Sequence, residues 1–262
     1  MNSDYKHHDH FQRIAPLYRN LRVTDSEPIA YIARQLKSLP LIKAADIGCG
    51  TGRYTQLLLQ HLGDKVSFIH CIDQSMGMLE QLKLDFAKHG FQAAGTISSS
   101  AMHLPIRTES LNCMFTFNAI HHFAMLEFLR ETARILQDGG YLFAYTRLRS
   151  QNSRNIWGRF FHLFTSKETR LYEEDELKDA ITKIPSLRLR KMQVFKFKRK
   201  GDLENLIKQA KNKHYSTLDL YSRSEFKTAL KQFHGNLLDY FDNPHDIQWV
   251  DENVLLVLQK AS

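Results

Sequence analysis

Short apolar runs alternate with amphipathic stretches along the first 150 residues. The apolar runs predict five strands, at 41–47, 66–72, 93–97, 111–117 and 141–146. The amphipathic stretches predict helices at 11–21, from Ser26, and at 51–61, 75–88 and 124–136, the last one ended by Asp138-Gly139-Gly140. Repeated strand–helix–strand units predict an α/β protein with a mainly parallel sheet, helices on both faces and right-handed crossovers.

The second half of the chain departs from this alternation. It contains two predicted strands, at 187–199 and 247–258, and four predicted helices, at 155–164, 173–184, 203–211 and 224–233. We interpret 1–150, completed by 173–200 and 245–262, as one α/β core. The two stretches 151–172 and 201–244 are then a helical lid built onto the sheet.

Composition restricts the class of protein. With 262 residues, 43% of them hydrophobic, the chain can bury a core without disulfides or a metal. No segment approaches the roughly 18 apolar residues of a membrane span, and the N-terminus has no apolar signal region. Only three cysteines are present, Cys49, Cys71 and Cys113, which indicates reduced thiols and a cytoplasmic protein. We expect no metal site.

The net charge of +8 is compatible with an anionic partner but does not require one. Between residues 187 and 213 there are ten Lys and Arg against two acids, the one cluster that could be a nucleic-acid footprint. Because basic and apolar residues partly alternate there, a solvated face of an amphipathic strand explains the cluster more simply. Arg147, Arg149 and Arg170 could bind an acidic substrate, although surface arginines are common.

The chemistry is concentrated where the first strand turns into a helix, at Asp46-Ile-Gly48-Cys-Gly50-Thr-Gly52. Three glycines allow a tight turn and close approach of a ligand to backbone. The spacing is not the dinucleotide G-x-G-x-x-G, because Arg53 replaces the third glycine. Asp46 suits a positive amino group, and Asp73, at the end of the second strand, suits a ribose diol. S-adenosylmethionine carries both groups.

Five ordered motifs extend this interpretation. They are Asp46-Ile-Gly-Cys-Gly-Thr-Gly, Cys71-Ile-Asp73-Gln-Ser, Leu104-Pro-Ile, Asn118-Ala-Ile-His-His and Glu131-x-x-Arg134-Ile-Leu-x-Asp-Gly-Gly. The series resembles the class I S-adenosylmethionine-dependent methyltransferases, in the broad group that includes ubiquinone and menaquinone C-methyltransferases. The resemblance covers residues 10–150. It implies a doubly wound, Rossmann-like sheet of seven strands and S-adenosyl-L-methionine as cofactor.

The resemblance also implies roles for individual residues. Those implied to bind the cofactor are Tyr18, Asp46, Gly48, Cys49, Gly50, Asp73, Gln74, Met78, Ser100, Ala101, Met102, Asn118, Ala119 and Ile120. Asp46 is expected at the methionine amino group, Asp73 at the ribose, and Asn118 to Ile120 at the sulfonium, while Tyr18 closes over the cofactor. Ser100 replaces the family's usual aspartate at the adenine, and a hydroxyl accepts a hydrogen bond more weakly than a carboxylate.

Two pairs of side chains are weaker candidates. His121 and His122, after the fourth strand, are the natural general bases if the acceptor must lose a proton. We favour the alternative that one packs under the cofactor and the other caps the next helix. Trp157 and Phe161 could line a substrate pocket, but aromatic residues at helical spacing are more often core.

Three functions remain open from the sequence. The first, which we favour, is methyl transfer to a small-molecule substrate, without membrane insertion. The second, less favoured, is methylation of RNA, most plausibly tRNA, with the basic residues of 188–213 on the phosphates. Asn118-Ala-Ile-His-His also loosely resembles a motif of tRNA wobble-uridine methyltransferases. The third is a non-catalytic protein that kept the fold and the cofactor site, since fold alone does not prove function.

Overall fold

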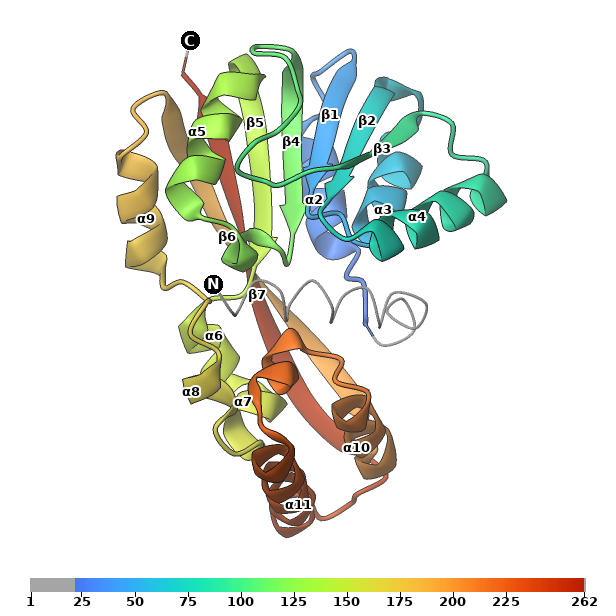
Figure 1. Ribbon diagram of the computed structural model, residues 1–262, viewed down its shortest axis with the longest axis vertical. Helices are drawn as coiled ribbons and strands as arrows, with labels where there is room; N and C mark the ends of the chain where they lie inside the picture. The colour runs from blue at the N-terminus through green and yellow to red at the C-terminus, as the bar shows by residue number, and fades with distance from the viewer. Residues whose placement is uncertain (1–21, 262) are drawn as a thin grey trace. The chain divides into compact units, whose positions relative to one another are not determined.

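The computed structural model describes residues 22–261, which divide into two compact units (Figure 1). Unit 1 consists of the described part of 1–146 together with 174–193 and 254–261. Unit 2 consists of 147–173 and 194–253. It takes in 194–200 and 245–253, which the sequence analysis gave to the core, because strands β6 (Leu187–Gly201) and β7 (Ile247–Lys260) have residues in both units. The role of a lid stays a prediction.

One seven-stranded sheet organises unit 1, in the order β3-β2-β1-β4-β5-β7-β6. Its first five strands are β1 (Ile42–Ile47), β2 (Val66–Asp73), β3 (Ala94–Ser98), β4 (Leu111–Phe117) and β5 (Leu136–Thr146). They are parallel to one another, and β7 is antiparallel to β5. The chain runs outward from β1 to β3 and then returns to β4, so the predicted α/β fold with a seven-stranded, Rossmann-like sheet is confirmed.

Helices cover both faces of this sheet. Those of unit 1 are α2 (Glu27–Gln35), α3 (Arg53–Leu62), α4 (Met76–His89), α5 (Met125–Ile135) and α9 (Glu174–Thr182), with short 3-10 turns at Gly63–Lys65 and Ile120–His122. Helix α4 contacts β2 and β3, whereas α5 contacts β5 and α9. Because right-handed crossovers reverse direction after β3, α3 and α4 lie on one face and α5 on the other.

The connection from β3 to β4, residues 99–110, contains no helix. In Figure 1 it crosses in front of the strands as an extended loop. One face of the sheet near β2 is therefore covered by loop rather than by a helix, which leaves Phe68 of β2 39% exposed.

The helix predicted at 124–136 agrees with α5 within one residue at each end, but its stop signal Asp138-Gly139-Gly140 does not lie in a loop. Helix α5 ends at Ile135, and β5 begins at the next residue, Leu136, which pairs with Leu111. The two glycines therefore lie inside the strand, where Gly139 has a left-handed φ of 76°. Glycine is typical both of a turn after a helix and of an irregular position inside a strand, so the sequence pattern alone did not distinguish the two.

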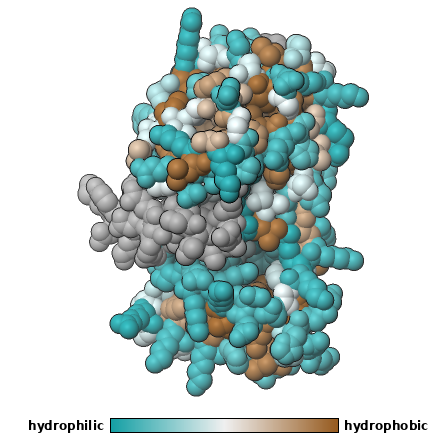
Figure 2. All heavy atoms as spheres, turned by 90° about the vertical axis from the view of Figure 1, so that its right-hand side faces the viewer, coloured by the Kyte–Doolittle hydropathy of each residue, from teal (hydrophilic) through white to brown (hydrophobic). Residues whose placement is uncertain are grey.

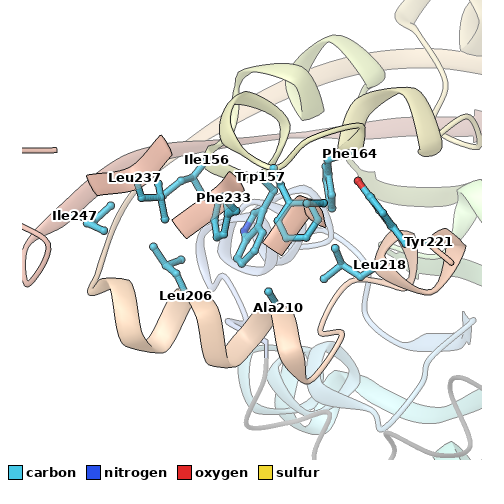
Figure 3. Packing of buried hydrophobic residues seen from close by; sticks show 12 residues of the cluster. Ile156, Trp157, Phe164, Leu206, Ala210, Leu218, Tyr221, Phe233, Leu237 and Ile247 are labelled. Carbon is cyan, nitrogen blue, oxygen red and sulfur yellow. The ribbon is translucent and has the colours of Figure 1, made fainter. Parts of the chain in front are cut away.

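Unit 2 has its own apolar core (Figure 3). Its helices are α6 (Arg149–Arg154), α7 (Ile156–Phe160), α8 (Phe164–Lys167), α10 (Leu203–Lys211) and α11 (Arg223–Tyr240), with a 3-10 turn at Ser216–Leu220. The single helix predicted at 155–164 is wrong. Asn155 caps a new helix by accepting a bond from the Gly158 N–H (2.8 Å), and Leu163 takes a left-handed φ of 63°.

Candidate functional site

The glycine loop after β1 is shaped by three left-handed residues, each for its own reason. Gly48, Gly50 and Gly52 have φ of 69°, 54° and 72°. A Cβ on Gly48 would lie 2.5 Å from the Ala119 Cβ, and one on Gly52 would lie 2.8 Å from Leu82 Cδ1. Among the residues that the structure describes, nothing lies within 4 Å of a Cβ built on Gly50. Two of the glycines thus allow packing, while Gly50 leaves its backbone open to a ligand.

The loop is fastened to the end of β2. The Gly50 N–H donates to Asp73 Oδ2 at 2.8 Å, and the Gly48 N–H donates to the Ile72 carbonyl at 2.7 Å. The other oxygen, Asp73 Oδ1, accepts from the Ser75 N–H at 2.9 Å. Asp73 is partly buried. Because a carboxylate offers about four acceptor positions, it can hold the loop and still accept bonds from a ligand diol.

Asp46 lies beneath the loop and is 1% exposed. Its Oδ2 accepts a bond from Thr55 Oγ1 at 2.5 Å. Its Oδ1 is buried and has no hydrogen-bond partner among residues 22–261. Desolvation raises the pKa of Asp46 to about 7, with Thr55 opposing and Asp73 adding to the shift. A buried acceptor without a donor fits a cationic ligand group, such as the ammonium of a methionine moiety.

The end of β4 closes against the same loop. Asn118 has a left-handed φ of 54°, and its N–H donates to the Tyr145 carbonyl at 2.7 Å. Ala119 and Ile120 are buried, and Ala119 is the residue that excludes a side chain at Gly48. The structure therefore brings the predicted sulfonium-lining segment against the predicted methionine-binding loop.

The two histidines that follow share one 3-10 turn. The rings of His121 and His122 have centroids 4.2 Å apart, and both residues are partly buried. This ring contact does not decide between a general base and residues that pack under the cofactor or cap the next helix. Both roles stay predictions.

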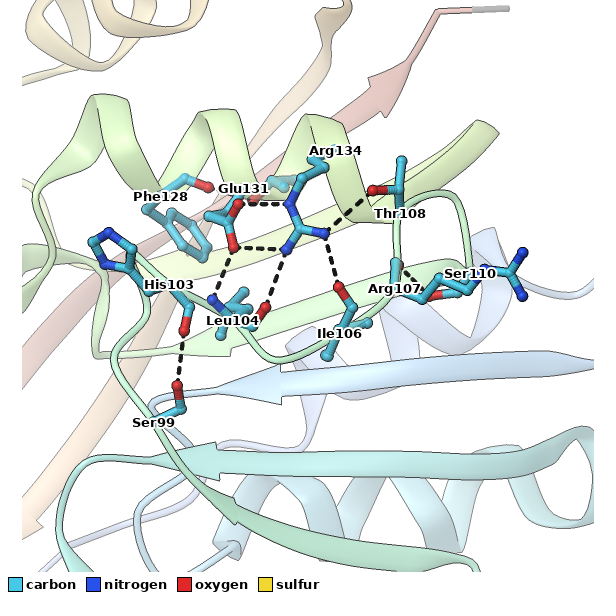
Figure 4. Close-up of polar contacts among 11 residues, drawn as sticks. Ser99, His103, Leu104, Ile106, Arg107, Thr108, Ser110, Phe128, Glu131 and Arg134 are labelled. Carbon is cyan, nitrogen blue, oxygen red and sulfur yellow. Dashed lines mark hydrogen bonds and ion pairs between the residues drawn. The ribbon is translucent and has the colours of Figure 1, made fainter.

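The segment expected at the adenine starts a turn held by its own serine. Ser100 Oγ accepts a bond from the Met102 N–H at 3.3 Å, and Ala101 is buried. The chain that follows is fixed by an ion pair on α5 (Figure 4). Arg134 pairs with Glu131 at 2.7 Å and donates to the carbonyls of Leu104 (3.1 Å) and Ile106 (2.8 Å). Glu131 in turn accepts from the Leu104 N–H at 2.8 Å.

The remaining residues predicted to bind the cofactor differ in their exposure. Met78 is 1% exposed on the inner side of α4, while Gln74 is exposed in the turn before it. Burial and the neighbouring Cys71 raise the pKa of the Cys49 thiol well above its usual range, which disfavours the thiolate that a nucleophilic cysteine needs. Tyr18 lies outside the described residues. Within 22–261 no cluster of three metal-ligating side chains occurs.

The two aromatic candidates lie in the core of unit 2. Trp157 is 3% exposed and Phe161 2%. The Trp157 ring stacks on Phe233 with centroids 4.9 Å apart (Figure 3). This burial favours the structural alternative over a substrate pocket.

Sequence reasoning missed three polar residues that shape the site. Thr55 holds Asp46, and Thr51 Oγ1 is buried without a partner in the described part of the chain. Arg53 reaches back to the segment before α2, donating to the Arg22 carbonyl at 3.0 Å and to Thr24 Oγ1 at 2.5 Å. Thr55 could have been found, because a residue in the first turn of α3 faces the strand end below it.

Comparisons with known proteins agree with this geometry. Residues 45–144 match the family model described as a methyltransferase domain. The mouse tRNA (carboxymethyluridine(34)-5-O)-methyltransferase ALKBH8 is 28% identical over 183 residues, 68% of this chain and 25% of the relative. The human probable tRNA methyltransferase 9B is 26% identical over 153 residues, 57% of this chain and 30% of the relative. The chain thus spans about a quarter to a third of the length of these curated relatives.

A solved structure shows the same fold. A putative methyltransferase from Bacillus halodurans superposes with a TM-score of 0.64 at 15% identity, covering 91% of this chain and all of that one. The matched domain, the strand order and the glycine loop together define a class I S-adenosylmethionine-dependent methyltransferase domain. The cofactor of this class is S-adenosyl-L-methionine, and the buried, unpartnered Oδ1 of Asp46 fits its ammonium group.

Proposed function

We propose that this chain transfers a methyl group from S-adenosylmethionine to an acceptor in tRNA. The observation that supports binding of the cofactor is the buried Oδ1 of Asp46, which has no hydrogen-bond partner among residues 22–261. S-adenosylmethionine supplies the methyl group on a sulfonium when it is bound. The residues of the chain would bind and orient: Asp46 the ammonium, Asp73 the ribose, and Asn118 to Ile120 the sulfonium end. Orientation is the main catalytic contribution in an in-line displacement.

Two observations support tRNA as the acceptor. Curated relatives that match over half the chain are described as tRNA methyltransferases. Unit 2 carries sixteen Lys and Arg against eleven acids, a net charge of +5 in 87 residues, whereas unit 1 carries +3 in 175. A basic unit attached to a methyltransferase domain is what a polyanionic acceptor requires. We therefore propose that unit 2 contributes the RNA-binding surface.

The surface is compatible with a polar partner. Hydrophilic residues cover most of the face drawn in Figure 2, and hydrophobic residues occur on it in small groups. No helix among the described residues is long and apolar enough to cross a membrane. Part of the basic surface is already paired, since Lys196 contacts Glu252 (3.5 Å) and Lys200 contacts Asp246 (3.1 Å). RNA binding would then have to displace these pairs, in which the lysines are exposed and the acids partly buried.

A transfer assay with isotopically labelled methyl groups tests the proposal. Total tRNA and a pool of small metabolites are offered separately, and the modified nucleoside is identified after digestion of the RNA. Binding to tRNA is measured over a salt series in parallel. We expect label in tRNA and a linear fall of log affinity with log salt whose slope corresponds to several phosphates. Binding no tighter than that of an unrelated basic protein would contradict an RNA acceptor.

A small-molecule acceptor is the second candidate. It is favoured by Arg147 and Arg170 of unit 2, which are held by acids and hydroxyls: Arg170 by Glu168 and Ser216 (3.2 Å), Arg147 by Asp251 (3.5 Å). Ordered guanidinium groups bind small carboxylates and phosphates, and such an acceptor would compete with Glu168 for Arg170 and with Asp251 for Arg147. Label appearing only in the metabolite pool, with tRNA unlabelled, would select this candidate.

A further inference from the structure

A cavity in unit 1 lies away from the glycine loop. It has a volume of about 460 Å³ and is lined by residues at the amino ends of β1, β2 and β4 and by the loop 105–107. The glycine loop and Asp73 lie at the carboxyl ends of the strands, so this cavity opens at the opposite edge of the sheet. A volume of this size can hold a ligand of several hundred daltons.

The floor of the cavity is aromatic. Phe68 is 39% exposed, although it lies on an inner strand of the sheet, because the connection above it is loop 99–110 rather than a helix. Its ring lies over Gly95 of β3, where an added Cβ would be 2.8 Å from Phe68 Cζ. The His70 ring meets it edge-on, with centroids 4.9 Å apart. A flat, partly exposed ring is thus held in place on two sides.

The rim of the cavity is cationic. Lys43 and Arg107 line it and are both exposed, and no carboxylate from the described part of the chain lines it. No ion pair involves either side chain among residues 22–261. In Figure 4 the Arg107 side chain points away from the Glu131–Arg134 pair that fixes the loop bearing it. The backbone of this segment is therefore fixed by hydrogen bonds, whereas the Arg107 guanidinium lines the cavity.

We propose that this cavity binds a nucleotide, with its base on the Phe68 ring and its phosphate between Lys43 and Arg107. An exposed aromatic ring flanked by cations is the arrangement by which proteins hold single-stranded nucleic acid, through stacking and charge. The ligand is either a free mononucleotide or one nucleotide of an RNA strand. The second source rests on the proposed tRNA acceptor, whereas the binding itself does not.

A titration followed by NMR tests this proposal. The Ile106 methyl group and the His70 ring, which line the cavity, report binding at this place. The ligands are uridine 5′-monophosphate, uridine, inorganic phosphate and a tetrauridylate. Saturating S-adenosylhomocysteine is present, so that a nucleotide cannot shift these signals through the cofactor site. We expect saturable shifts with uridine monophosphate and much weaker binding of uridine and of phosphate alone.

Variants assign the two contacts. Phe68→Leu removes the ring but keeps an apolar side chain, and should weaken uridine monophosphate binding by about five- to 150-fold, the range for one stacked base. Lys43→Ala with Arg107→Ala should bind uridine monophosphate no better than uridine. Lys83→Ala with Lys88→Ala is the matched control, because both lysines are exposed on α4 outside the cavity. Unchanged cofactor binding in each variant confirms that the fold is intact.

The outcomes distinguish an RNA strand from a free nucleotide as the ligand, and a failure of this proposal from a failure of the proposed function. Tighter binding of tetrauridylate than of the mononucleotide assigns the site to an RNA strand, and the reverse assigns it to a free nucleotide. Equal binding of phosphate and nucleotide, or shifts that survive both variants, would overturn the proposal. Because no methyl transfer is measured, a failure here is distinct from a failure of the proposed function, which would appear as absent cofactor binding or transfer.

Discussion

Gly50 and Asp73, which are 23 residues apart in the chain, are joined by a 2.8 Å hydrogen bond from the glycine N–H to the carboxylate. The residue expected to hold the ribose therefore also holds the loop expected to receive the methionine end. Loss of Asp73 should affect both ends of the cofactor at once.

Asp73→Ala should weaken cofactor binding by roughly 1.5–3 kcal/mol, the cost of losing hydrogen bonds to a charged group. Calorimetric titration with S-adenosylhomocysteine measures this change. Asp64→Ala, an exposed acid on the same unit, is the control. An affinity unchanged by Asp73→Ala would mean that this carboxylate does not face the cofactor.

Asp46 predicts a pH dependence of cofactor binding. Because burial raises its pKa to about 7, the protein without cofactor holds Asp46 protonated below neutrality. An ammonium ligand requires the ionised form, so affinity should rise by up to about tenfold per pH unit between pH 5 and 7. Titrations across this range check the slope, and Asp46→Asn should abolish it.

The same group predicts the opposite trend for stability without cofactor. A raised pKa means that the folded state binds the proton more tightly than the unfolded state. The free energy of unfolding should therefore fall as pH rises from about 4 to about 7, at up to about 1.4 kcal/mol per pH unit. Denaturant unfolding of the wild type and of Asp46→Asn isolates this contribution. Identical slopes in the two proteins would contradict the raised pKa.

The glycines of the loop should respond differently to alanine. At Gly50 the new methyl group has open space, so the cost to stability is about 1–2 kcal/mol from the left-handed φ alone, whereas cofactor affinity should be largely lost. At Gly48 the methyl would collide with Ala119, and stability should fall further. Thermal unfolding together with titration distinguishes them. Full cofactor affinity in Gly50→Ala would remove the loop from the binding site.

Arg134 should be needed for the order of the 104–106 segment. Arg134→Lys loses the fixed fork that reaches Glu131 and two carbonyls, and should cost about 1–2 kcal/mol of stability. Hydrogen exchange at the Leu104 N–H, which bonds to Glu131, should accelerate. Arg130→Lys, exposed on the same helix, is the control. Unchanged exchange at Leu104 would show that the clamp is dispensable.

Phe161 decides between core and substrate pocket in unit 2. Phe161→Ala should destabilise the protein by about 3–5 kcal/mol, as expected for a buried aromatic residue. Unfolding measurements give this value. A raised KM for the acceptor with stability unchanged would instead restore the substrate role.

The strands and helices of unit 1 were predictable because their pattern follows from burial. Strand β4 has the predicted bounds, Leu111–Phe117, since its apolar residues recur at every second position, 111, 113, 115 and 117, and all four are buried. The helices α6 to α8 were not predictable as three. Asn155 and Gly158 are compatible with either one helix or a break, and the contacts that decide between them come from residues far along the chain, such as Phe233.

The candidate site was predictable where its backbone conformation favours glycine. Gly48, Gly50 and Gly52 marked the tight turn, because glycine readily adopts the left-handed φ that such a turn needs. Asp73 was recognisable as the residue at the carboxyl end of β2. The depth of Asp46 could not be read from the chain, because its burial depends on how α3 packs over the loop.

Cofactor binding at Asp46 is decided by calorimetric titration of the chain with S-adenosylhomocysteine at pH 7.5, with the Asp46→Asn variant alongside. We expect saturable one-to-one binding by the wild type and a large loss of affinity in the variant. No heat of binding at millimolar ligand, or equal affinity in both proteins, would contradict it.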